Sequence, residues 1–298
     1  MSTKRSRILV MALCAVGLLL WQAGSSYAAT FREDFESGTW PTANQEQSTT
    51  QQVGAFYYGW YGGGDGSGSW AYSTEKAHSG THSLKINFPQ SDTYCAFPRA
   101  KLTSSSSGVT FTEVTMGGWF YFPPNFDNTG QSNKFMNFRM EGLNGILVAL
   151  DGDLTFHLGW HVPPGYYPEG SPHTIPYERL YVVNSDKSRF HVSRGQWHQM
   201  EFYIKPAGDS YTGKLRLKVD GKVMKVTYGA TGQEGTGTLI DCDLHDFNFG
   251  GSTVDTVDFI LNTSSGMPAG QYMYWDDIYV TTGDASSPVN PAGTAAHP

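Results

Sequence analysis

The chain has 298 residues, of which 27 are Asp or Glu and 20 are Lys or Arg, so its formal net charge is −7. This acidic balance argues against nucleic acid or an anionic membrane surface as the main partner. The length is sufficient for one substantial hydrophobic core, and all-β sandwiches of this size are often single domains.

The first residues have the three-part layout of a secretory signal peptide. A basic segment at 4–7 precedes an apolar run from Ile8 to Leu20, and small residues follow at 24–29. We expect cleavage after Ala28, which removes residues 1–28 and gives a secreted or periplasmic protein. The alternative is an uncleaved anchor, but an apolar run of 13 residues is short for a bilayer. No later run is apolar enough to cross a membrane. Loss of three basic residues with the signal changes the net charge from −7 to −10.

The rest of the sequence predicts an all-β protein built from antiparallel strands. Short alternating runs are separated by clusters of Gly, Pro, Asn, Asp and Ser, and no long helical periodicity is present. Asp151-Gly152 and Asp220-Gly221 are typical of tight hairpin turns. We therefore expect one sandwich over residues 29–282. The predicted strands are Ser83–Phe88, Thr115–Phe122, Lys134–Met140, Leu147–Leu150, Leu154–Trp160, Trp197–Lys205, Lys214–Val219, Lys222–Thr227, Thr256–Leu261 and Tyr272–Val280.

Two segments are interpreted as long loops, Ala55–Trp70 with aromatics among glycines and Val162–Glu178 with many Pro and Tyr. Long loops without regular structure are often functional. The tail at 283–298 lacks apolar residues that could pack, so we expect it to be disordered.

The segment from Lys134 to His161 carries the strongest functional signal. Side chains alternate across a strand, so Asn137, Arg139 and Glu141 share one face of the first strand. His157 and His161 likewise share a face with Thr155 on the second strand. Such residues suit a polar ligand and proton transfer better than an ordinary solvated face. The alternatives are an Arg139–Glu141 ion pair that only fixes the sheet, and histidines that are satisfied strand residues.

Lys134 is excluded from this polar set by its position in the strand. It has the opposite parity from Arg139, so the two side chains share a face only if a β-bulge intervenes.

The two ends of the mature chain resemble secreted carbohydrate-active jelly rolls. The resemblance lies in FREDFESG at Phe31–Gly38, AHSGTHSLKINF at Ala77–Phe88 and YMYWDDIYV at Tyr272–Val280. It implies that the first and last strands lie side by side. It also implies a structural calcium at the matching carboxylates, since calcium prefers oxygen ligands. These are Asp34, Glu36 and Asp277; the alternative is that they are solvated strand-end residues.

The middle of the chain is similar to a narrower group. The matching segments are Tyr121–Phe138, SRGQWHQMEFY at Ser193–Tyr203 and GKLRLKVDGK at Gly213–Lys222. Their order resembles the concanavalin A-like β-jelly rolls of polysaccharide lyases, of the glucuronan and alginate lyase kind. The resemblance implies a jelly-roll sandwich that acts on a uronic-acid polysaccharide by β-elimination.

Elimination needs a group that neutralises the sugar carboxylate, a base for the C5 proton and an acid for the leaving oxygen. No metal is required, and we expect no cofactor for catalysis. Arg139 can make a forked contact with a carboxylate. The candidate catalytic residues are Asn137, Arg139, Glu141, His157, His161 and Tyr203, with Tyr181, Tyr166 and Tyr167 as other sources of the acid. The candidate substrate-binding residues are Tyr58, Trp60, Tyr166, Tyr167, Gln199 and Glu201.

Two other functions stay open. A glycoside hydrolase needs two carboxylates close together, for example Glu141 and Glu201, although no E-x-D-x-x-E string is present. A non-catalytic binding module would use the loop aromatics, because sugar C–H groups stack on aromatic faces; the aromatics could equally serve loop packing. Cys95 and Cys242 could form a disulfide or be two separate thiols. We expect a monomer with a polysaccharide partner.

Overall fold

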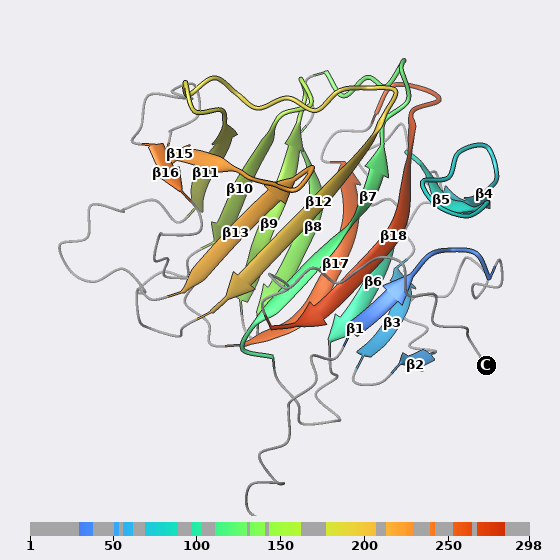
Figure 1. Cartoon of the computed structure of the whole chain (residues 1–298), viewed down its shortest axis with the longest axis horizontal. Helices are drawn as coiled ribbons and strands as arrows, with labels where there is room; N and C mark the ends of the chain where they lie inside the picture. The colour runs from blue at the N-terminus through green and yellow to red at the C-terminus, as the bar shows by residue number, and fades with distance from the viewer. Residues whose placement is uncertain are drawn as a thin grey trace, which may run out of the picture.

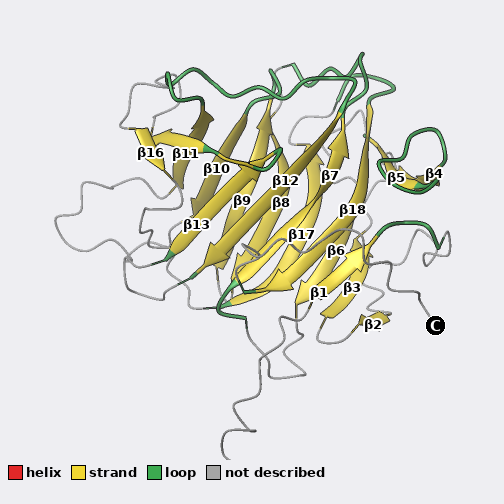
Figure 2. Ribbon diagram, in the orientation of Figure 1, coloured by secondary structure: helices red, strands yellow, loops and turns green. Residues whose placement is uncertain are grey.

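The computed structural model describes residues 30–37, 51–53, 56–61, 69–88, 97–102, 111–129, 132–140, 143–161, 177–206, 213–228, 239–241, 253–263 and 267–283. These residues form two stacked antiparallel sheets without a helix (Figure 1, Figure 2). Within these ranges no helix is long and apolar enough to cross a membrane. The fold is an all-β jelly-roll sandwich, as the sequence predicts.

The first sheet has eight strands, in the order β14-β13-β12-β7-β18-β5-β4, and β1 also pairs with β18. The pairing of β1 with β18 confirms that the first and last strands lie side by side. The strands are β1 (Thr30–Glu33), β4 (Ser69–Ser73), β5 (Ser83–Asn87), β7 (Val114–Tyr121), β12 (Trp197–Lys205), β13 (Lys214–Val219), β14 (Lys222–Val223) and β18 (Tyr272–Thr282).

The second sheet has ten strands, in the order β16-β15-β11-β10-β9-β8-β17-β6-β3-β2. Its strands are β2 (Gln51–Val53), β3 (Phe56–Tyr61), β6 (Phe97–Leu102), β8 (Ser132–Met140), β9 (Leu143–Asp151), β10 (Phe156–His161), β11 (Tyr177–Val183), β15 (Lys225–Tyr228), β16 (Leu239–Asp241) and β17 (Val254–Thr263). Nine of the ten predicted strands are present, with boundaries that shift by a few residues. The tenth, Lys222–Thr227, is divided into β14 in the first sheet and β15 in the second.

The hydrophobic core lies between the two sheets and is rich in aromatic rings. Phe120 from the eight-stranded sheet packs edge-on against Phe135 and Phe156 from the ten-stranded sheet, at centroid distances of 5.0 and 6.3 Å. Trp275 packs against both Phe120 and Phe135. Each fully buried ring contributes about 1.5–3 kcal/mol of transfer free energy. The core therefore fixes which face of each sheet is left for polar residues.

The structure corrects the interpretation of Ala55–Trp70 as one long loop. Phe56–Tyr61 forms β3, which pairs with β2 and β6, and β4 begins at Ser69. Aromatic residues are good strand formers, so FYYGWY reads as a strand once it has neighbours to pair with.

Several predictions lie outside the described residues. They are the signal peptide 1–28, the tail from residue 284 onwards, the loop at 162–176, Glu141 and both Cys95 and Cys242. They stay predictions.

Candidate functional site

A row of side chains crosses the face of the ten-stranded sheet that is turned away from the core. On β10, Phe156 and Leu158 belong to the core, so His157 between them points to the other face. The register pairs His157 with Tyr181 on β11 and with Ala149 on β9. Directly opposite residues share a face, so the three side chains lie side by side.

A β-bulge on β8 brings Lys134 into the same row. Lys134 pairs with Ala149, whereas Met136 pairs with Val148, so two steps along β8 match one step along β9. Phe135 and Met136 both enter the core as a result. Lys134 is exposed on the polar face, separated from His157 by two strand spacings, or roughly 10 Å. The parity rule had excluded this lysine unless a bulge was present.

Asp151 lies next to His157 and holds its ring. The Nδ1 atom of His157 is 3.0 Å from both carboxylate oxygens of Asp151. The Nη2 group of Arg189 donates to Oδ2 of Asp151 at 2.6 Å and also contacts Thr155. Burial alone would raise the pKa of Asp151, but hydrogen bonding and charge from His157, then from Arg189, hold that pKa below its usual range. Asp151 is therefore an anion that fixes one side of the imidazole.

Tyr181 completes this group. Its ring centroid is 6.1 Å from that of His157, and the guanidinium carbon of Arg189 lies 4.5 Å from the Tyr181 ring centroid. Both rings are almost fully buried, with 1% of His157 and 2% of Tyr181 exposed. The sequence analysis named Tyr181 only as one of several candidates for the catalytic acid. It did not name Asp151 or Arg189 as site residues. Asp151 had been interpreted as a hairpin residue, which it also is.

The other predicted site residues on this sheet are placed by register. Asn137 is buried and pairs with Leu147 on β9 and Asp258 on β17, so it lies on the polar face one row away from His157. Arg139 pairs with Thr256, and His161 pairs with Tyr177. The side chains of Arg139 and His161 lie outside the described part of the chain, as do those of Tyr58 and Trp60 on β3. Tyr166 and Tyr167 lie outside it entirely.

Tyr203, Gln199 and Glu201 lie on the other sheet. All three are on β12, whose core-facing residues are Met200, Phe202 and Ile204. Their side chains are therefore on the outer face of the eight-stranded sheet, across the sandwich from His157. Tyr203 is therefore not the partner of His157. The sequence could not show this, because the alternation within a strand does not reveal which sheet the strand joins.

No family model matches the sequence, and no curated protein matches it. Among solved structures, the chain is similar to an alginate lyase from the marine Aplysia kurodai, at 16% identity over 75% of this chain and 90% of that one, with a TM-score of 0.50. It is also similar to the endo-β-1,4-glucuronan lyase of Trichoderma reesei, at 14% identity over 85% and 94% of the two chains, with a TM-score of 0.48. An alginate lyase from Chlorella virus gives 12% identity, 71% and 88% coverage and a TM-score of 0.49.

The chain shares the jelly-roll fold of the Aplysia kurodai alginate lyase. At this identity the likeness shows the fold and no particular activity.

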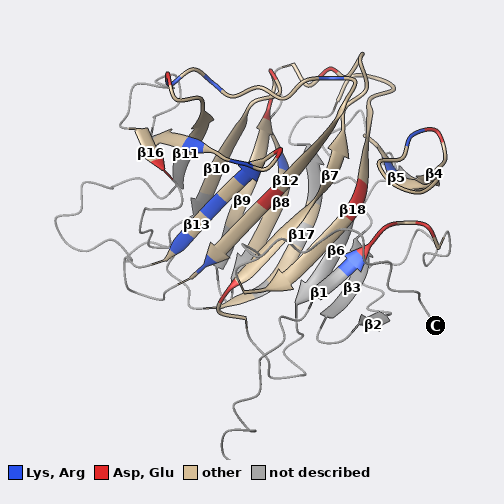
Figure 3. Ribbon diagram, in the orientation of Figure 1, with Lys and Arg blue, Asp and Glu red and all other residues tan. Residues whose placement is uncertain are grey.

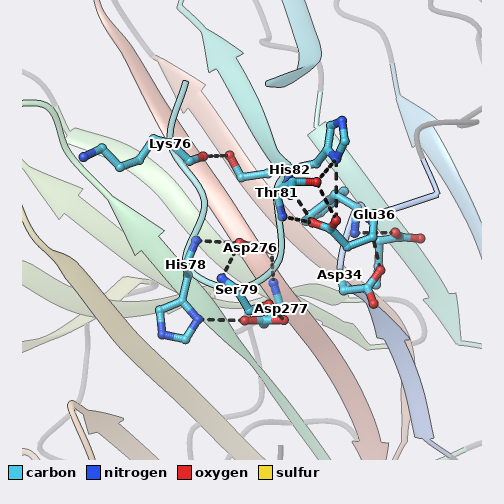
Figure 4. A network of polar contacts seen from close by, with 12 residues as sticks. Asp34, Glu36, Lys76, His78, Ser79, Thr81, His82, Asp276 and Asp277 are labelled. Carbon is cyan, nitrogen blue, oxygen red and sulfur yellow. Dashed lines mark hydrogen bonds and ion pairs between the residues drawn. The ribbon is translucent and has the colours of Figure 1, made fainter. Parts of the chain in front are cut away.

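The three carboxylates predicted to bind calcium belong to a hydrogen-bonded network (Figure 4). Glu36 accepts hydrogen bonds from the backbone N–H groups of Thr81 and His82, at 2.9 and 2.7 Å, and from the Thr81 hydroxyl. Asp277 contacts His78 Nδ1 at 2.7 Å and accepts from the Ser79 hydroxyl.

These donors occupy both carboxylate oxygens of Glu36 and of Asp277, the kind of oxygen that calcium prefers. Asp34 accepts from the backbone N–H of Glu36. Among the described residues, no group of three His, Cys, Asp or Glu could hold a metal ion. Asp34, Glu36 and Asp277 do not form such a group in the described residues, and the network fastens the loop at 76–82 to the ends of β1 and β18.

Proposed function

We propose that the protein is a polysaccharide lyase that cleaves a uronic-acid-containing polymer by β-elimination. The observation that carries this proposal is the pairing of His157 with Tyr181, with Asp151 bound to the far side of the histidine ring. Base, acid and orienting carboxylate are thus adjacent on one sheet face that also carries Lys134 and Arg189.

His157 is the proposed base. An ionised Asp151 at Nδ1 favours the tautomer that carries its proton on Nδ1, which leaves the Nε2 lone pair to accept a proton. Nε2 takes the C5 proton of the uronate, and the C–H electron pair forms the C4=C5 double bond. The C4–O bond then breaks, and its electron pair goes to the leaving oxygen. The negative charge of Asp151 stabilises the imidazolium that results.

Tyr181 is the proposed acid. Its side chain is the cross-strand neighbour of His157, so one sugar can contact both residues. The phenol donates its proton to the leaving oxygen as the C4–O bond breaks. The Arg189 guanidinium over the Tyr181 ring, 4.5 Å from the ring centroid, stabilises the negative charge that develops on the phenol.

The sugar carboxylate is assigned to Lys134 and Asn137, with Arg139 in the same strand. Lys134 supplies a positive charge and Asn137 an amide donor on the polar face of β8. Withdrawal of charge from the carboxylate makes the C5 proton more acidic, which is the main difficulty of the reaction. Because His157 and Tyr181 are almost fully buried, polymer binding must first uncover their rings.

Hydrolysis is less well supported by the same residues. A retaining hydrolase needs two carboxylates about 5 Å apart. Asp151 is already engaged by His157 and Arg189. Glu201 is on β12 of the eight-stranded sheet, whereas β8, which ends just before Glu141, belongs to the ten-stranded sheet. Glu201 is also engaged by Lys218 and the Tyr279 hydroxyl, so we do not propose Glu141 and Glu201 as acid and nucleophile.

The proposal is tested with a panel of polymers: glucuronan, alginate, polygalacturonate and, as a neutral control, laminarin. Elimination creates an unsaturated uronate that absorbs in the ultraviolet, in step with new reducing ends. We expect that absorbance on at least one uronate polymer and none on laminarin. Reducing ends without the absorbance would indicate hydrolysis, and retention of the protein in a polymer-containing gel with neither signal would indicate a binding module.

A further inference from the structure

Thr227 carries a buried hydroxyl that has no hydrogen-bond partner among the described residues. The residue is 0% exposed, and its Oγ1 atom is buried and unpaired. Thr227 follows Val226 on β15, and Val226 belongs to the core, so the Thr227 side chain lies on the polar face of the ten-stranded sheet. An unpaired buried hydroxyl is unfavourable, and a ligand that supplies the missing partner removes that penalty. The hydroxyl is therefore a candidate for contact with a ligand.

Thr227 continues the row of side chains that forms the candidate active site. It pairs with Tyr181 on β11, and Tyr181 pairs with His157 on β10. His157 pairs with Ala149 on β9, and Ala149 pairs with Lys134 on β8. Residues directly opposite one another form a line across the strands, which are about 4.8 Å apart. The row crosses five adjacent strands, of which β8 to β11 can be followed in Figure 3, and Thr227 ends it on the far side of Tyr181.

The polar part of the row ends at Thr227. On the next strand, β16, the residue opposite Thr227 is the apolar Leu239. In the described part of the chain β16 is also the edge of the sheet. A ligand that lies along the row therefore has Thr227 as its last polar contact at this end.

The proposed chemistry gives the row a direction. The uronate that loses its C5 proton lies between Lys134 and His157, over Ala149, whose side chain is a single methyl group. Tyr181 protonates the oxygen on C4 of that uronate, and this oxygen is the bridge to the next sugar. When the C4–O bond breaks, the oxygen stays on the next sugar and becomes its new reducing-end hydroxyl. The leaving sugar therefore lies beyond Tyr181, where Thr227 is the next residue of the row.

We propose that Thr227 binds the leaving sugar of a uronic-acid polymer through a hydrogen bond between its hydroxyl and an oxygen of that sugar. This inference rests on the proposed function, and it gives the polymer a path across the strands, with the new reducing end over β15 and the unsaturated sugar over β9. A threonine hydroxyl both donates and accepts, so it can pair with a sugar hydroxyl or with a carboxylate. Thr227 is covered in the free protein, as are His157 and Tyr181, and becomes accessible in the same rearrangement.

The kinetic test compares Thr227→Val with Thr227→Ser on the uronate polymer that the protein cleaves. Valine keeps the branched shape and removes the hydroxyl. We expect KM to rise about tenfold in Thr227→Val with kcat within about twofold of wild type, because the contact is made in the ground state and the transition state alike. Thr227→Ser should restore most of the binding. A wild-type KM in Thr227→Val would overturn the proposal, as would a fall in kcat at unchanged KM, which would place the effect on Tyr181.

Thr115→Val is the matched control, because it removes a buried hydroxyl that does have a partner. Thr115 lies on the outer face of the eight-stranded sheet, between core residues Val114 and Met116, and its hydroxyl donates to the carbonyl of Gly283 at 3.0 Å. Thr115→Val should lower the melting temperature and leave KM unchanged. Thr227→Val should melt no lower than wild type, because it removes an unpaired group. An equal loss of melting temperature in the two variants would show that the Thr227 hydroxyl serves the fold, and would overturn the proposal.

A binding experiment separates this inference from the proposed function. Tetrasaccharides of alginate and of glucuronan are titrated calorimetrically into His157→Ala and into His157→Ala/Thr227→Val, so that neither is cut. We expect the dissociation constant to be about tenfold higher in the double variant. If the protein cleaves no uronate polymer but the double variant binds more weakly, the Thr227 contact stands and the lyase function fails. Cleavage by the wild type with equal dissociation constants in the two variants would leave the lyase function standing and overturn the Thr227 contact.

Discussion

His157 and Tyr181 lie directly opposite each other on β10 and β11, with ring centroids 6.1 Å apart and Asp151 bound to Nδ1 of the histidine. This relationship joins a base, its orienting carboxylate and an acid in one place. Each part can be changed separately, because the three side chains come from three different strands.

Replacing Asp151 by Asn should lower kcat by about 10²- to 10⁴-fold while leaving KM close to wild type. The neutral amide no longer stabilises an imidazolium, and its oxygen and nitrogen no longer enforce one tautomer. Asp153→Asn is the matched control, because Asp153 accepts only the Thr155 hydroxyl and contacts His191 through its backbone carbonyl. Steady-state kinetics on the active polymer give the answer. A wild-type kcat in Asp151→Asn would show that His157 does not depend on this carboxylate.

Lys134→Gln should lower kcat/KM on a uronate polymer by about 10- to 100-fold, the range expected for one charge-assisted contact. The residue is exposed at a bulge, so the melting temperature should hardly change. Lys134→Arg should restore part of the activity, since it keeps the positive charge. The control is Lys187→Gln, in an exposed turn. An unchanged kcat/KM in Lys134→Gln would place the carboxylate elsewhere.

Glu33 should make the protein less stable as the pH rises towards neutrality. Burial, more than its other surroundings, raises the pKa of this carboxyl from 4.5 to about 7. The folded state then binds a proton more tightly than the unfolded chain, so the contribution is complete below pH 4.5 and is lost as pH rises through 7. It amounts to at most about 3 kcal/mol.

Glu33→Gln should remove most of this slope, because glutamine still accepts the Phe35 N–H and does not ionise. Melting temperatures at pH 5, 6, 7 and 8 measure it. Asp186→Asn is the control, since hydrogen bonds from Ser188 lower the pKa of Asp186 and so keep its titration below this window. Parallel curves of melting temperature against pH for Glu33→Gln and wild type would refute the assignment. Part of the slope should remain in Glu33→Gln, because burial and the charge of Asp277 raise the pKa of Asp276 to about 7 as well.

A chelator should leave the melting temperature unchanged, and added calcium should not raise it by more than about 1 °C. The carboxylates of Glu36 and Asp277 already accept N–H and O–H donors, so they gain little by changing partners. Differential scanning calorimetry with EDTA and then with millimolar calcium is sufficient. A rise of several degrees with calcium, lost in Asp277→Asn, would show that the ion displaces this network.

Alternation predicted ten runs that overlap β5, β7–β10, β12–β15, β17 and β18, and the resemblance to jelly rolls implied that β1 and β18 pair. Alternation also placed Asn137 and His157 on polar faces. Alternation cannot reveal a bulge, and Phe135 and Met136 together in the core are what return Lys134 to that face. Lys134 was excluded by its parity in the strand, and the one extra residue of the β-bulge reversed that parity.

The sequence also could not predict which strands share a sheet. The face of β12 with Gln199, Glu201 and Tyr203 looks as suitable as that of β10, but β12 joins the eight-stranded sheet. Long-range pairing decides this, and no local pattern encodes it. Tyr177–Val183 was not among the predicted strands, and its first two residues were wrongly assigned to the loop Val162–Glu178. The position of Tyr181 beside His157 could therefore not be foreseen.

The most direct test of the account is the rate of ultraviolet absorbance increase on the active uronate polymer for His157→Ala against His191→Ala. His191 is an exposed histidine that contacts the backbone carbonyl of Asp153, and it serves as the neighbouring control. We expect His157→Ala to lose at least about 10³-fold in kcat with its fold intact by circular dichroism, while His191→Ala stays within about threefold of wild type. Wild-type turnover in a folded His157→Ala variant would contradict it.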